Sequence, residues 1–210
     1  MNIFLVLLLC FVPLIAVFLI FKFTLKTKTV YQLFSVLFGL LAVLPITFLQ
    51  FYLDGFSWFN SNKWISVFLK AIIFNGLIEE MLKMVFLFLL PSRKMTLGQF
   101  FTCALLCGLT LSCFESIVYF LKDLQQANAT GAQLLYNKIF IRMITSDLIH
   151  TFCTGLAGLF VWSIKNKWCD ICALILPVIF HGLYNLFTQY TPAVSWFSWF
   201  AFAAILFAAL

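Results

Sequence analysis

Two adjacent carboxylates and a lysine stand in the middle of an almost wholly apolar stretch of the sequence, FNGLIEEMLKMVFLFLLP at residues 74–91. An ionisable side chain at the centre of a bilayer costs about 3 kcal/mol on insertion scales, and such groups usually face a protein interior or a water-filled cavity. Glu79, Glu80 and Lys83 are therefore the first candidates for groups that do chemistry.

Other apolar runs also carry polar residues, and their spacing is helical. These candidates are Glu115, Asp147, His150, His181 and Asn185. Residues three or four positions apart share one face of a helix. Asp147 therefore lies on the face of His150, and Asn185 on the face of His181. Each run is expected to present a small polar face to the others.

Helix geometry also relates the residues of the first stretch to the histidines. Glu79 and Glu80 point about 100° apart, and Lys83 is within reach of either, so the two carboxylates can have different roles. At a rise of about 1.5 Å per residue, both glutamates and His181 lie roughly 20 Å from the nearest basic loop. His150 lies near the middle of its own run. These depths agree, which predicts a shared cavity.

Carboxylates and imidazoles in one cavity can deprotonate a water molecule and stabilise an oxyanion, as hydrolysis of a peptide bond requires. We expect Glu79 and Glu80 to activate and position the water, with Glu80 as the favoured base. Glu115 is expected to be a second acid or a ligand, and His150 and His181 oxyanion donors or metal ligands. The supporting residues are Lys83, which tunes the charge of the glutamates, and Asp147 and Asn185, which orient the histidines.

The same side chains could hold a divalent metal, because imidazole nitrogen and carboxylate oxygen are ligands of zinc. The candidate ligands are Glu80, Glu115, His150 and His181. The sequence contains no His-Glu-x-x-His helix, so no zinc site follows from that motif. Catalysis by the glutamates alone and catalysis with zinc or another divalent metal both stay open.

Two other classes of function use the same residues. A proton- or cation-coupled transporter or channel would arrange the carboxylates and histidines as a relay or an ion site. A non-catalytic binding scaffold would keep them only as a polar core. Transport predicts flux without peptide cleavage, whereas a scaffold predicts neither.

The elements that must position these residues follow from the composition. Of the 210 residues, 64% are hydrophobic and 10% are charged, and the mean hydropathy is +1.10. Several runs reach the roughly 20 residues that a membrane helix needs, which predicts an all-α polytopic membrane protein. Seven spans are expected, at about residues 3–21, 30–51, 64–90, 97–121, 139–164, 172–189 and 193–210. They form one transmembrane domain over residues 1–210, with a motif-bearing core at about 64–190 and a first run that is retained.

Lysine and arginine are unevenly divided between alternate loops. The loops after the first, third and fifth spans hold seven basic residues, whereas those after the second, fourth and sixth hold three. The excess of positive charge in cytoplasmic loops predicts an N-terminus outside and a C-terminus in the cytoplasm. These loop residues account for most of the net charge of +6, so no nucleic-acid partner is expected. The compact chain favours a bacterial inner (cytoplasmic) membrane.

Four short motifs resemble those of one family. Glu79-Glu80-Met81-Leu82-Lys83 resembles the Glu-Glu-x-x-Lys motif of the PrsW family of intramembrane proteases. That family is distantly similar to the CAAX prenyl protease and Abi superfamily, in which Glu-Glu-x-x-x-Arg occupies the corresponding helix.

The other three motifs follow in the order of that family. Residues 108–119, GLTLSCFESIVY, resemble the second motif, with Glu115 where the CAAX-type relatives carry histidine and Leu111 where phenylalanine is typical. His150, with two glycines after it, and FHGLYN at residues 180–185 resemble the third and fourth motifs. The lysine at position 83 and the glutamate at position 115 favour the PrsW branch.

The resemblance spans about residues 75–185 and implies a reaction. Members of the PrsW family cleave single-span membrane proteins near the outer side of the bilayer (site-1 proteolysis), with bacterial anti-sigma factors as the substrate type. The resemblance therefore implies an intramembrane endopeptidase whose partners are a single-span substrate and the lipid bilayer.

Overall fold

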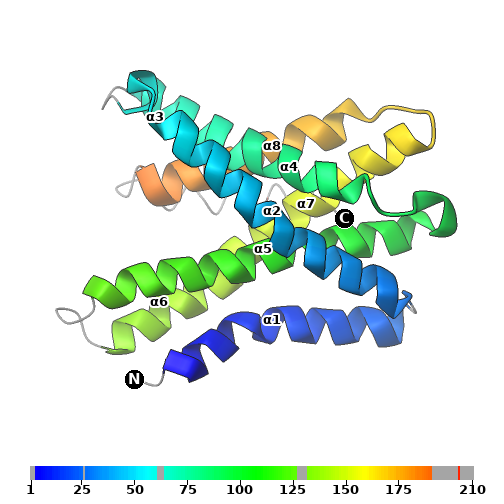
Figure 1. Cartoon of the computed structure of the whole chain (residues 1–210), viewed down its shortest axis with the longest axis horizontal. Coiled ribbons are helices and arrows are strands. Elements are labelled where there is room, and N and C mark those ends of the chain that lie inside the picture. Colours follow the sequence, from blue (N-terminus) through cyan, green and yellow to red (C-terminus); the bar gives the residue numbers. More distant parts are fainter. Residues whose placement is uncertain (1–2, 26, 61–63, 127–131, 191–202, 204–210) are drawn as a thin grey trace.

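The computed structural model describes residues 3–25, 27–60, 64–126, 132–190 and 203, and these residues form helices and short connections without a strand (Figure 1). The helices are α1 (Ile3–Thr24), α2 (Thr29–Asp54), α3 (Trp64–Lys70), α4 (Glu79–Leu87), α5 (Leu97–Gln126), α6 (Ala132–Ile144), α7 (Ser146–Lys165) and α8 (Ile171–Asn185). A π-helical segment, Ala71–Ile78, joins α3 to α4, and another, Leu186–Tyr190, follows α8.

Five helical stretches of the described residues are long and apolar enough to cross a membrane: Phe4–Thr24, Thr29–Asp54, Leu97–Lys122, Ile139–Lys165 and Ile171–Thr188. The expected all-helical membrane architecture is confirmed. The expected third span, residues 64–90, is divided among α3, the π-helical segment and α4, so no single helix of it reaches spanning length. The expected seventh span, residues 193–210, lies outside the described residues apart from Ala203.

The polar segment between the expected fourth and fifth spans differs from the prediction. The spans expected at residues 97–121 and 139–164 leave residues 122–138 as a loop, but α5 continues to Gln126 and α6 begins at Ala132. Polar side chains end a membrane span without ending a helix, because the helical hydrogen bonds form between backbone groups. A second difference is a break at Thr145, which divides the expected fifth span between α6 and α7.

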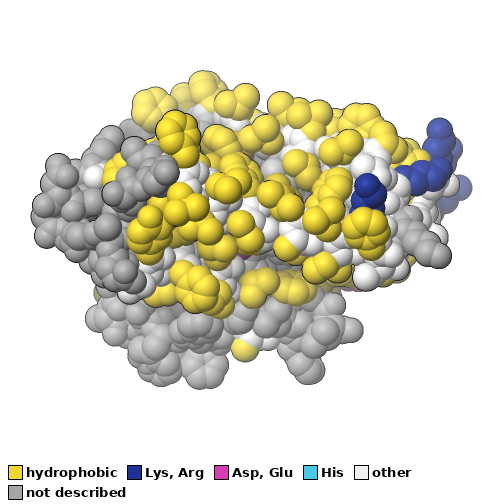
Figure 2. All heavy atoms as spheres, turned by 90° about the horizontal axis from the view of Figure 1, so that it is seen from below, with side chains coloured by type: hydrophobic (Ala, Val, Ile, Leu, Met, Phe, Trp, Pro, Cys, Tyr) yellow, Lys and Arg dark blue, Asp and Glu magenta, His cyan; other side chains and the backbone are white. Residues whose placement is uncertain are grey.

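The outer face of the bundle is apolar. Phe4, Leu44, Phe48 and Phe51 of α1 and α2 are each more than two-thirds exposed, and Figure 2 shows hydrophobic side chains spread over one face, with lysine and arginine gathered at one end. The loops between α1 and α2, α4 and α5, and α7 and α8 all lie at the same end of the molecule (Figure 1). A lipid-facing surface with one basic rim is what a membrane-embedded bundle requires.

Helix α5 lies at the centre of the bundle and packs closely on α7. A Cβ atom added at Gly108 of α5 would lie 2.3 Å from the carbonyl oxygen of His150 on α7. Gly158 of α7 faces Ala104 of α5, where an added Cβ would lie 2.4 Å from the alanine Cβ. Small residues let membrane helices approach until their backbones touch. These contacts fix the position of α7 along α5.

Gly108→Ala is therefore expected to destabilise the bundle. The added methyl group meets backbone rather than a side chain that could turn away, and such overpacking costs roughly 1–3 kcal/mol or more. Gly98→Ala on the same helix is the matched control, because nothing lies within 4 Å of an added Cβ there. The measurement is unfolding of both variants by sodium dodecyl sulfate in mixed micelles. Equal stability of the two variants would contradict the close α5–α7 contact.

Candidate functional site

Two tight helix pairs bring the candidate residues together. The π-helical segment before Glu79 packs on α8, where a Cβ added at Gly76 would lie 2.3 Å from the carbonyl oxygen of Val178, and one added at Gly182 would lie 2.9 Å from Cα of Ile72. This contact places Glu79, at the start of α4, beside His181 of α8. The α5–α7 contact at Gly108 does the same for Glu115 and His150.

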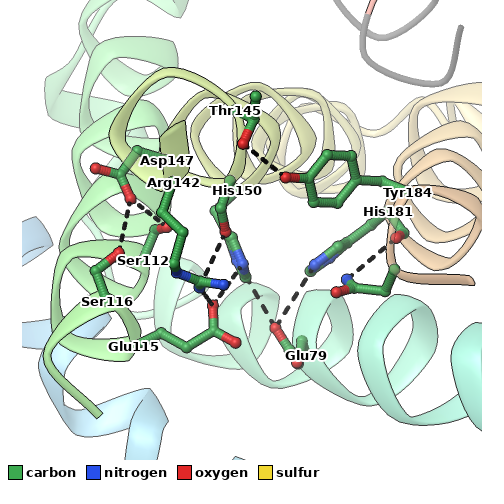
Figure 3. A network of polar contacts seen from close by, with 12 residues as sticks. Glu79, Ser112, Glu115, Ser116, Arg142, Thr145, Asp147, His150, His181 and Tyr184 are labelled. Carbon is green, nitrogen blue, oxygen red and sulfur yellow. Dashed lines mark hydrogen bonds and ion pairs between the residues drawn. The ribbon is translucent and has the colours of Figure 1, made fainter. Parts of the chain in front are cut away.

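Three side chains converge at the centre of the bundle, as Figure 3 shows. Glu79 Oε2 lies 3.7 Å from His150 Nδ1 and 3.8 Å from His181 Nε2. The two imidazole rings lie edge to face with their centroids 4.4 Å apart. Glu79 Oε2, His150 Nδ1 and His181 Nε2 are buried and have no hydrogen-bond partner among the described residues. Buried polar atoms are rarely left without a partner, so this cluster calls for a ligand.

The cluster fits a divalent metal. The three atoms lie within 4.8 Å of one another. The two distances to Glu79, 3.7 and 3.8 Å, are a few tenths of an ångström wider than the separation of about 3.4 Å that tetrahedral zinc ligands have at about 2.1 Å from the ion. Glu80 is paired with Lys83 and Glu115 with Arg142, but no lysine or arginine of the described residues is paired with Glu79. A cation between Glu79, His150 and His181 would balance that carboxylate and bind all three free atoms.

Glu80 lies behind the cluster. Its Oε1 accepts from Lys83 Nζ at 2.5 Å and lies 2.8 Å from His181 Nδ1, and its Oε2 accepts from Thr154 Oγ1 at 3.3 Å. Glu80 and Lys83 are fully buried. Glu80 is the residue expected to be the favoured base and a metal ligand; here both of its oxygens are engaged by protein side chains, and it contacts the nitrogen of His181 that points away from the cluster.

Glu115 has the corresponding place beside the other histidine. Its Oε2 lies 3.0 Å from His150 Nε2 and accepts from Arg142 at 3.2 Å. The guanidinium of Arg142 in turn lies 4.0 Å from the ring centroid of Tyr119. Each histidine thus has a carboxylate on one nitrogen and the cluster on the other, which is how outer carboxylates orient metal-binding histidines. Unlike Glu80, the Glu115 side chain is 26% exposed.

The two residues expected to orient the histidines are placed differently from each other. Asp147 accepts from Ser112 at 2.6 Å and from Ser116 at 3.4 Å, and Figure 3 shows these three residues together on the far side of Arg142 from the histidines. Asn185 Nδ2 donates to the backbone oxygen of His181 at 3.3 Å. Asn185 therefore lies next to the site, whereas the hydrogen bonds of Asp147 join α7 to α5.

Gln50 of α2 was missed by the sequence reasoning. Its Nε2 donates to Glu79 Oε1 and to the backbone oxygen of Phe74, at 3.1 Å each. π-Helical turns recur at functional sites, and their wider turns leave some backbone groups free for other partners. The backbone oxygen of Phe74 is such a group, and Gln50 donates to it. The only signal in the sequence is the Gln50 amide within the apolar run ITFLQFYL. This signal is weak, because polar residues are common near the end of a membrane span.

Comparison with known proteins identifies the family. No curated protein and no solved structure gives a significant match. The sequence profile described as PrsW family intramembrane metalloprotease matches residues 28–210, which is most of the chain and includes every residue of the cluster. The resemblance to this family is thereby confirmed, and an integral membrane protease acting on membrane proteins is what this family implies. The chain belongs to the PrsW family of intramembrane metalloproteases.

Proposed function

We propose that this protein is a zinc-dependent endopeptidase that hydrolyses peptide bonds of single-span membrane proteins at the Glu79–His150–His181 cluster. The observation that carries the proposal is the set of three buried atoms without partners, all directed at one point. The cluster is closed on the side of Glu80, which is fully buried, and open on the side of Glu115, which is partly exposed.

The roles of the side chains follow from their contacts. Zinc held by Glu79, His150 and His181 would supply Lewis-acid activation of a water molecule and of the scissile carbonyl. Glu80 holds His181 by its Nδ1 and is itself neutralised by Lys83. Glu115 holds His150 by its Nε2 and, being partly exposed, can accept a proton from the attacking water and give it to the leaving amine.

The substrate and the membrane are assigned by the family resemblance. Single-span proteins of the anti-sigma-factor type, cut near the outer side of the bilayer, are the proposed substrates. The proposed location is a bacterial inner (cytoplasmic) membrane. The basic end of the bundle faces the cytoplasm, with the N-terminus outside and the C-terminus inside, because cytoplasmic loops are enriched in lysine and arginine.

The test is cleavage of a panel of single-span membrane proteins in liposomes. We expect the wild type to cut at least one of them, a strong chelator to stop the reaction, and added zinc to restore it. Glu115→Gln, assayed at saturating zinc, is expected to lower kcat by about 100-fold or more, as removal of a general acid–base does; its zinc affinity should also fall by about 10–100-fold, because Glu115 orients His150. Asp147→Asn is the matched control, and its rate is expected to stay near that of the wild type.

Two results would contradict the proposal. Cleavage that persists in the chelator would exclude the metal, and full activity of Glu115→Gln would exclude its role in proton transfer. Ion flux in the same liposomes, lost in Glu79→Gln and accompanied by no cleavage of any substrate, would favour the transporter alternative.

A further inference from the structure

A groove connects the candidate site with the lipid-facing surface between α2 and α5. Its volume is about 320 Å³, at the lower end of the usual range for ligand sites, about 300–1,000 Å³. Glu79 lies at its inner end. The lining residues from α2 are Val43, Ile46, Thr47 and Gln50, and those from α5 include Leu111, Glu115, Val118 and Tyr119.

The crossing of α2 over α5 closes the space between the two helices at one end of the groove. A Cβ added at Gly39 would lie 2.3 Å from the carbonyl oxygen of Cys107, so the two backbones touch there. Ala42, Ile46 and Leu111 fill the next layer. Beyond it the two helices diverge toward the C-terminal ends of both (Figure 1), and the groove occupies the space between them.

The lining of the groove is partly apolar and partly polar. Val43, Ile46, Leu111 and Val118 are apolar, whereas Gln50, Glu79 and Glu115 bring polar groups next to the buried cluster. Polar groups directed at lipid hydrocarbon are costly unless they have partners. A groove that is open to the lipid face yet polar next to the buried cluster therefore suits a ligand that carries hydrogen-bonding groups on an apolar body.

We infer that this groove binds an unwound, extended stretch of the substrate's membrane span and delivers its scissile bond to Glu79. The inference rests on the protease function proposed above. A substrate helix is about 10 Å wide and its carbonyl groups are bonded within the helix, so it can neither enter 320 Å³ nor present a free peptide bond. An extended strand needs partners for its backbone groups, which the polar groups of the lining offer, while its apolar side chains contact the apolar part of the lining.

The orientation of the groove gives the substrate a defined path. Of the lining residues, Lys122 is exposed and Glu79 is buried, so a strand in the groove runs from the surface near Lys122 toward the cluster. Tyr119, beside Lys122 in the lining, is also the ring that stacks on Arg142. The groove is thus continuous with the Arg142–Glu115–His150 chain of contacts.

Filling the groove tests the inference. Thr47→Trp and Val118→Trp are expected to lower kcat/KM for the best single-span substrate by about tenfold or more. A change of pocket shape by even one methylene group changes kcat/KM by about this factor. Leu44→Trp and Leu121→Trp are the matched controls on the same two helices, because Leu44 and Leu121 are 71% and 45% exposed and do not line the groove. The controls are expected to cut like the wild type, and all four variants to keep the bound zinc. Equal rates in fillers and controls would overturn the inference.

A cross-linking measurement separates this inference from the proposed hydrolysis. A photoreactive residue at position 118 or 121 of the full chain in nanodiscs is illuminated with a synthetic peptide that has one membrane span and a central glycine pair to ease its unwinding. Preferential cross-linking from position 118 supports the groove, even if the peptide is not cut. Equal cross-linking from both positions would overturn it, whether or not cleavage occurs.

Discussion

Purified wild-type protein is expected to contain about one zinc ion per chain, and Glu79→Gln, His150→Ala and His181→Ala are each expected to lose it. Each of the three side chains contributes one unpartnered buried atom to the cluster. Loss of a residue that only orients a ligand weakens metal binding by about 10–100-fold, so loss of a ligand should weaken it by at least as much. Elemental analysis of the folded, detergent-solubilised protein measures the ratio of metal to chain.

Asp147→Asn is the matched control for metal content. Asp147 is as buried as the cluster residues and lies on the same helix as His150, but it bonds Ser112 and Ser116. The control is expected to keep its metal. Binding should also stabilise the fold, by about 2.7 kcal/mol at a zinc concentration 100 times Kd, so the unfolding transition of the wild type should shift with zinc. Equal metal content in all four variants would exclude this cluster as the metal site.

Glu80→Gln is expected to have two separate effects. It leaves Lys83 buried without its counterion, and breaking one side of a buried ion pair costs roughly 3–5 kcal/mol of stability. It also replaces the carboxylate that holds His181 Nδ1, so metal affinity should fall by about 10–100-fold. Unfolding by sodium dodecyl sulfate measures the first effect, and titration of the metal-free protein with zinc measures the second.

A double substitution separates these effects. In Glu80→Gln/Lys83→Met the buried charge is gone, and replacement of a buried pair by apolar or neutral groups is often close to neutral for stability. The double variant should therefore unfold like the wild type but still bind zinc weakly. If both properties recover together, Glu80 acts on the metal only through the stability of the fold. If neither recovers, the Lys83–Glu80 pair is not the cause of the instability.

The helical membrane architecture and the candidate polar residues could be predicted because lipid imposes strict rules. A chain in hydrocarbon must form its backbone hydrogen bonds within each span, and an ionisable group there needs a reason to be retained. These rules pick out eight candidates from the sequence alone: Glu79, Glu80, Lys83, Glu115, Asp147, His150, His181 and Asn185. The spacing within one helix also predicted that Glu79 and Glu80 would point in different directions.

The assignment of roles could not be predicted, because it depends on how each helix is rotated against the others. Spacing shows that the two glutamates differ, but the contact of Gly76 and Gly182 with the backbone of the facing segment is what brings Glu79 to His181 Nε2 and Glu80 to His181 Nδ1. Asp147 shares the face of His150 in projection, yet its carboxylate bonds Ser112 on α5. Gln50 reaches Glu79 from a helix 29 residues away in the chain. Residues on one helix have directions fixed by local geometry, whereas contacts between helices follow from packing between distant parts of the chain.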